Sequence, residues 1–115
     1  MYFVFSLLGL IGGLLCCAGD ILFDLKGKGN QKLGTSKNID SNWVNMADRR
    51  FGLSIALAMI GDAFIGLGFY SIGMQIAETH PLIGYLTIGF GYFGSIAGVF
   101  IHAFLCIQAL IYKGA

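Results

Sequence analysis

The stretch FGLSIALAMIGDAFIGLGFYSIGMQI, residues 51–76, decides the fold class of this chain. It holds one charged residue, Asp62. A helix rises about 1.5 Å per residue, so 26 residues exceed the roughly 30 Å hydrocarbon core of a bilayer. We therefore predict that residues 51–76 form a membrane-spanning helix.

Two further apolar segments flank this one and lead to the same prediction. Residues 2–25 begin with a run, Tyr2 to Gly19, that has no charge, and residues 83–112 follow Pro81, which suits the first turn of a helix. Over the 115 residues, 57% are hydrophobic and 11% are charged, whereas about a quarter are charged in a typical soluble domain. We predict an all-α integral membrane protein, a single membrane domain over residues 1–115 whose three helices pack through glycine-rich faces.

The charges are concentrated in one connecting segment, residues 26–50, which carries six of the seven bases. Because basic loops stay on the cytoplasmic side, we place this loop inside, the short 77–82 loop outside, the N-terminus out and the C-terminus in. Within the loop, Asp40 or Ser41 can cap a short helix that lies at the membrane interface. We expect membrane lipid headgroups to bind Lys26, Lys28, Trp43, Arg49 and Arg50.

Small residues recur along each predicted helix and indicate where helices pack. Gly9 and Gly13 form a GxxxG pair, and Gly94 and Gly98 form another in the third helix. Small or polar residues also follow four-residue steps, in the series Gly12, Cys16, Asp20, Asp24; Ser54, Ala58, Asp62, Gly66, Tyr70; and Gly94, Gly98, His102, Cys106. We expect these three stripes to converge.

Three ionisable residues on the stripes need an explanation, since a charge inside the bilayer is costly and faces a partner, water or another helix. Counted from the loop boundaries, Asp62 and His102 lie about 18 Å and 16 Å deep, and Asp20 lies near 10 Å. One hypothesis is a proton or cation site formed by Asp62 and His102 with the help of Asp20. The alternative is a hydrogen-bonded link that fixes how the helices pack.

The chain contains no recognised catalytic motif. Cys16, Cys17 and His102 include metal-ligand and nucleophile types, but no CxxC or HxxxH spacing supports a metal site, and thiols in apolar surroundings are usually inert. We expect no metal, no cofactor and no nucleic-acid partner. An enzyme acting on a lipid or redox substrate stays as one alternative.

Three helices are a small set for burying polar groups, so we expect a homo-oligomer or a partner membrane subunit. The first functional hypothesis is a small proton- or cation-linked transporter-like protein. The second is a structural or assembly subunit of a membrane complex.

Three groups of residues carry a resemblance to a known kind of protein. They are the run Gly19 to Gly27, the residues Ser41-Asn42-Trp43 with Arg50-Phe51, and Phe100 to Ala103. In these the chain resembles a family of uncharacterised bacterial polytopic membrane proteins, and it is similar to the N-terminal half of longer members. The resemblance implies a bacterial cytoplasmic membrane and no established activity.

Overall fold

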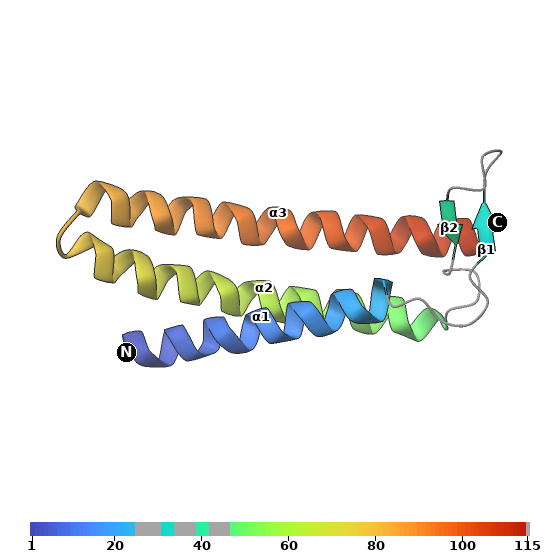
Figure 1. The fold of residues 1–115 in the computed structure, drawn as a ribbon, viewed down its shortest axis with the longest axis horizontal. Helices are drawn as coiled ribbons and strands as arrows, with labels where there is room; N and C mark the ends of the chain where they lie inside the picture. The colour runs from blue at the N-terminus through green and yellow to red at the C-terminus, as the bar shows by residue number, and fades with distance from the viewer. Residues whose placement is uncertain (25–30, 34–38, 42–46, 115) are drawn as a thin grey trace.

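The computed structural model describes residues 1–24, 31–33, 39–41 and 47–114, and the described part is dominated by three long helices (Figure 1). They are α1 (Tyr2–Asp24), α2 (Asp48–Ala77) and α3 (Pro81–Gly114). Each is long and apolar enough to cross a membrane. The predicted all-α class with three such helices is confirmed.

Two of the helices begin earlier than the sequence predicted. Helix α2 starts at Asp48, three residues before the apolar run, because Ala47 already accepts the first helical hydrogen bond from Arg50. Helix α3 starts at Pro81 itself, whose missing N–H needs no partner in a first turn. The turn between α2 and α3 is therefore short.

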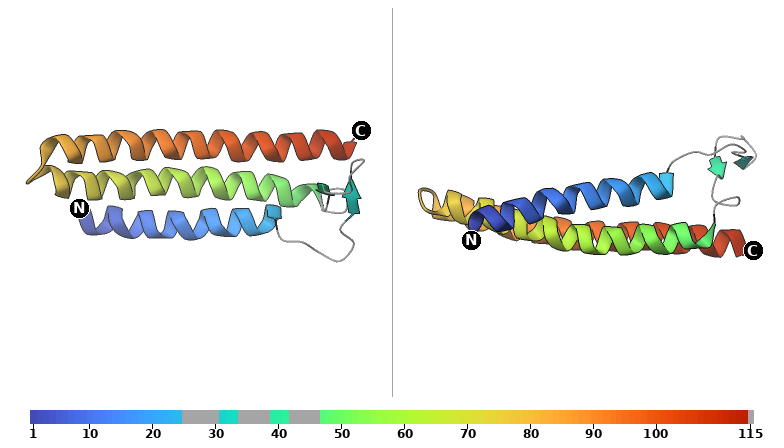
Figure 2. Two further views of the ribbon diagram at one scale, coloured as in Figure 1. Left: turned by 45° about the horizontal axis from the view of Figure 1, so that its top comes forward. Right: turned by 90° about the horizontal axis from the view of Figure 1, so that it is seen from below.

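Helix α2 lies between α1 and α3 and packs against both (Figure 2). Both neighbours run antiparallel to it. Seen from the side, α1 lies close to the other helices at its N-terminal end and diverges from their plane towards its C-terminal end.

Glycines of both helices form the contact between α1 and α2. A Cβ atom at Gly9 would lie 2.7 Å from the Cα of Gly68, and one at Gly12 would lie 2.7 Å from the backbone nitrogen of Ile65. Gly61 faces Gly12 and Cys16 in turn. The two backbones approach this closely only because side chains are absent, which is how helices associate where lipid removes the hydrophobic drive.

Two buried serines of α2 form hydrogen bonds across this contact, one towards each end. Ser54 donates to the carbonyl oxygen of Gly19 at 2.7 Å, and Ser71 donates to that of Tyr2 at 2.9 Å. Ser6 and Gln75 also contact the Ser71 hydroxyl, at 2.9 Å and 3.3 Å. Ser54 and Ser71 are fully buried, so their hydrogen bonds hold the two helices at one relative position.

The contact between α2 and α3 combines glycines with a small apolar cluster. Gly73 and Gly84 face each other across it near the turn. At the other end, Phe51, Cys106 and Ala109 are buried together. This cluster fixes the two helices beside the segment that connects α1 to α2.

Two of the four predicted packing glycines have a different environment. Gly9 packs as expected, and Gly98 lies beside the Asp62 carboxyl. At Gly13 and Gly94, a Cβ atom would meet no described atom within 4 Å. Within the described chain it is Gly12, one residue before Gly13, that faces α2, because a packing face follows mixed three- and four-residue steps.

The outer surface of the helices is strongly apolar. Large side chains with more than two-thirds of their area exposed include Phe3, Phe90, Phe93 and Phe100. A water-soluble monomer rarely exposes a contiguous apolar surface of this extent. The exposed faces therefore suit contact with lipid.

The connecting segment contains a short hairpin, in which β1 (Gln31–Leu33) pairs antiparallel with β2 (Ile39–Ser41). Asp40 and Ser41 are thus in a strand, and the short helix predicted to follow them falls on residues 42–46, which lie outside the described residues. Lys26, Lys28 and Trp43 lie outside the described residues. Arg49 and Arg50 are in the first turn of α2, at the end of the molecule where the hairpin and the C-terminus lie (Figure 1).

Candidate functional site

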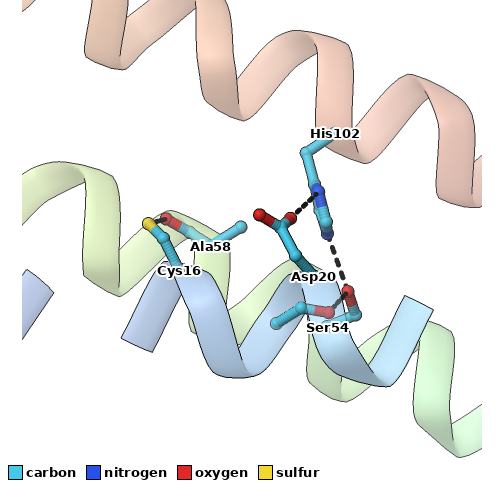
Figure 3. Close-up of polar contacts among 6 residues, drawn as sticks. Cys16, Asp20, Ser54, Ala58 and His102 are labelled. Atoms are coloured by element: carbon cyan, nitrogen blue, oxygen red, sulfur yellow. Dashed lines mark hydrogen bonds and ion pairs between the residues drawn. The ribbon is translucent and has the colours of Figure 1, made fainter. Parts of the chain in front are cut away.

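One polar cluster joins all three helices (Figure 3). His102 of α3 contacts α1 and α2 through its two ring nitrogens: Nδ1 lies 3.3 Å from Oδ1 of Asp20, and Nε2 lies 2.7 Å from Oγ of Ser54. Ser54 in turn bonds to Gly19. These groups, Asp20, Ser54 and His102 with the Gly19 carbonyl, are called the three-helix cluster, and through the His102–Asp20 contact they join α1 directly to α3.

Local sequence explains why these groups meet. A Cβ atom at Gly19 would lie 3.1 Å from the carbonyl oxygen of Ser54, so the missing side chain lets α1 come within hydrogen-bond range of α2. Asp20 follows directly and points past α2 towards His102 (Figure 3). The side chain of Asp20 is 62% exposed, whereas that of His102 is 13% exposed. The pair is therefore open on the Asp20 side and closed on the His102 side.

Hydrogen-bond donors and acceptors fix where the protons of the cluster lie. The Ser54 hydroxyl has one hydrogen, which it donates to the Gly19 carbonyl, so Nε2 of His102 must carry a hydrogen and donate to Ser54 Oγ. Nδ1 then faces the Asp20 carboxyl, and a proton between these two atoms would join them by a hydrogen bond. With that proton present, histidine and aspartate together have no net charge, and without it they have a charge of −1.

Asp62 lies close to this cluster on α2. It interacts electrostatically with His102 and Asp20, and it interacts with the Cys16 thiol of α1. Its carboxyl oxygens lie 3.4 Å and 3.5 Å from where a Cβ atom of Gly98 would be. The Cys16 thiol also points to the Ala58 carbonyl at 3.9 Å (Figure 3). Asp62 thus occupies the region between the helices on the inner side of the cluster.

The three predicted site residues lie near one another. The sequence paired His102 with Asp62 and gave Asp20 a supporting role; Asp62 interacts electrostatically with His102, and the structure adds an ion pair between His102 and Asp20. This direct contact of Asp20 was not predicted because four-residue steps rotate by about 40° each around a helix, so stripes drawn this way drift off the contact face. Ser54 was visible on such a stripe, but nothing in the sequence showed that its hydroxyl orients the histidine.

A cleft between α2 and α3 begins at Asp62 and was not predicted. It has a volume of about 180 Å³, and its lining includes Asp62, Tyr92 and Ser95. The ring of Tyr92 lies over Gly66, where a Cβ atom would be 3.2 Å from the ring. Ser95 and Tyr92 carry no signal in the sequence, because a lone serine or tyrosine in an apolar helix has many structural roles.

Metal binding was considered for the same region. Within the described ranges, no group of three or more His, Cys, Asp or Glu side chains is arranged to hold a metal ion.

The fold and the cluster define a class: a small protein of three apolar helices, consistent with a membrane protein, with ionisable groups between the helices. The chain belongs to a family of unknown function, DUF6796, whose model matches residues 2–115. No curated protein and no solved structure matches the chain. The resemblance to an uncharacterised family is confirmed at this level.

Proposed function

We propose that this protein is a proton- or cation-linked, transporter-like protein of a bacterial cytoplasmic membrane. The observation that carries the proposal is the His102–Asp20 ion pair, which lies within two candidate membrane spans and whose Asp20 side chain is 62% exposed on the surface of the helices. The basic segment 26–50 and the C-terminus are placed in the cytoplasm and the N-terminus outside, as the positive-inside rule favours. Arg49 and Arg50 then lie at the level of the lipid headgroups.

The charge of the three-helix cluster supports this role. When the shared proton leaves, a net charge of −1 stays in apolar surroundings, and the cluster then favours the binding of a proton or another cation. Asp62, which interacts with both members of the pair, provides a second carboxyl towards the membrane interior. A proton taken up from water at Asp20 can pass to Nδ1 of His102 within the 3.3 Å contact.

The test is proton movement across liposomes that contain the purified protein. Under a pH gradient, the wild type is expected to change the internal pH faster than empty liposomes do, and Asp20→Asn and His102→Gln are expected to reduce the rate at least tenfold. Asp62→Asn, which removes the second carboxyl, is expected to reduce it as well. Glu78→Gln, in the turn between α2 and α3, is the matched carboxyl control and should keep the wild-type rate.

Helical content by circular dichroism and elution as one species distinguish lost function from lost folding. A wild type that moves no protons, or an Asp20→Asn variant that folds and moves them at the wild-type rate, contradicts the proposal.

A second candidate function is a subunit of a membrane assembly, either with copies of itself or with a partner subunit. Its support is Gly94, which faces open space on α3 beside the exposed Phe90 and Phe93. An exposed glycine in a membrane helix allows another helix to approach closely. Gly94→Leu is expected to dissociate the assembly without altering the fold of the single chain, as measured by native mass spectrometry from lipid. A strictly monomeric wild type contradicts this role.

A further inference from the structure

The cleft between α2 and α3 combines one carboxylate with an otherwise apolar lining. Asp62 contributes its charge, and Met59, Ile96 and Val99 contribute apolar side chains. Met59 and Ile96 are 54% and 57% exposed, so the cleft opens on the outer surface of the helices. A ligand in the membrane can therefore reach Asp62 without crossing the three-helix cluster.

Ser95 supplies an independent sign that the cleft takes a polar ligand. Its side chain is 9% exposed, and its hydroxyl oxygen is buried without a hydrogen-bond partner among the described residues. A hydroxyl in a helix usually satisfies itself by donating to the carbonyl four residues earlier. Thr87 does so on the same helix, with Oγ1 2.9 Å from the Ile83 carbonyl. Burying a hydroxyl without a hydrogen bond costs free energy. A ligand atom that forms a hydrogen bond with the Ser95 oxygen would remove this cost.

Tyr92 and the size of the cleft narrow the ligand class. Asp62 attracts a positive charge, and Tyr92 adds an aromatic ring to the lining of the same cleft. The volume of about 180 Å³ is close to the roughly 150 Å³ that holds one benzene molecule in an apolar cavity. A ligand with one ammonium group and one ring-sized apolar group matches the charge, the hydroxyl and the volume together.

We propose that the cleft binds a monovalent organic ammonium ion, with its N–H groups donating to Asp62 and Ser95 and its apolar group among Met59, Ile96 and Val99. The site is distinct from the His102–Asp20 pair. The inference goes beyond the proposed function and stands without it, because it concerns binding and not proton movement.

The probe is benzylammonium, titrated by calorimetry into the full chain in detergent micelles, with empty micelles subtracted. Saturable binding is expected for the wild type, and toluene, which has the same ring but no charge, is expected to bind at least tenfold more weakly. Asp62→Asn should weaken benzylammonium binding by about 10- to 100-fold, since a charged hydrogen bond is lost. Ser95→Ala should weaken it by roughly 2- to 10-fold.

Ala63 lines the cleft and is exposed, so Ala63→Phe fills the cleft without disturbing buried packing and should abolish binding. Glu78→Gln and Thr87→Val are matched controls outside the cleft and should bind as the wild type does. The proposal is overturned if the wild type shows no saturable binding, if toluene binds equally well, or if the folded Ala63→Phe variant retains binding. Ser95→Ala and Ala63→Phe leave the His102–Asp20 pair intact, so their effect separates this proposal from the proton-linked function.

Discussion

Replacing Gly12 by alanine is expected to lower the free energy of unfolding by about 3 kcal/mol, the upper part of the range for overpacking a core. The added methyl group would meet the Gly61 carbonyl and lie 2.7 Å from the backbone nitrogen of Ile65. Backbone atoms cannot rotate away as a side chain can, so α1 must move off α2. That movement also weakens the contacts of Gly9 with Gly68 and of Cys16 with Gly61.

Gly13 is the matched control, because it is the next residue in the same helix and its Cβ direction is open. Gly13→Ala gains helix propensity, worth up to about 1 kcal/mol, and meets no described neighbour. Its stability should equal or slightly exceed that of the wild type. Reversible denaturation in mixed micelles, followed by circular dichroism, measures both variants. Equal stabilities for Gly12→Ala and Gly13→Ala would show that α1 does not pack against α2 through Gly12.

Replacing Ser54 by alanine is the second change with a large expected effect, a loss of about 3 kcal/mol. The hydroxyl is fully buried, donates to Gly19 and accepts from His102. Its removal leaves two buried polar groups without this partner, and each costs roughly 1–3 kcal/mol. The variant also removes the hydroxyl that orients Nε2 of His102, so the proton movement assigned to the Asp20 pair should fall together with the stability.

The control for Ser54→Ala is Thr87→Val, which removes a hydroxyl that donates to the Ile83 carbonyl within the same helix. It should change the free energy of unfolding by less than about 0.5 kcal/mol, as an exposed substitution does. The same denaturation experiment applies. If Ser54→Ala is as stable as Thr87→Val, the serine does not hold α1, α2 and α3 together.

The class of fold was predictable because it rests on length and composition. Residues 51–76 carry one charge, and a segment of that kind has few alternatives to a membrane-spanning helix. The helix ends were less predictable. Asp48 is charged, as loop residues often are, yet it belongs to α2. A helix continues past the apolar run wherever its backbone hydrogen bonds can form.

The residues of the candidate site could be picked out from the sequence, but the His102–Asp20 ion pair could not. Asp20, Asp62 and His102 stood out because charge is rare in these helices, but which carboxylate meets Nδ1 depends on the relative rotation of α1 and α3. If the predicted position of α1 along α3 is wrong by one helical turn, another residue of α1 takes the place of Asp20 beside His102. Ser54, Ser95 and Tyr92 could not be recognised, because their roles arise from contacts between helices and not from residue type.

The two serine hydrogen bonds between α2 and α1 limit how these helices can move. The acceptors Tyr2 and Gly19 are as far apart along α1 as the donors Ser71 and Ser54 are along α2, roughly 25 Å at 1.5 Å per residue. Sliding α1 lengthwise would break both bonds at once, whereas pivoting about the Ser71 end breaks only the bond at Gly19. Any rearrangement that separates Asp20 from His102 is therefore a swinging motion of α1, with its hinge at the N-terminal end of the chain.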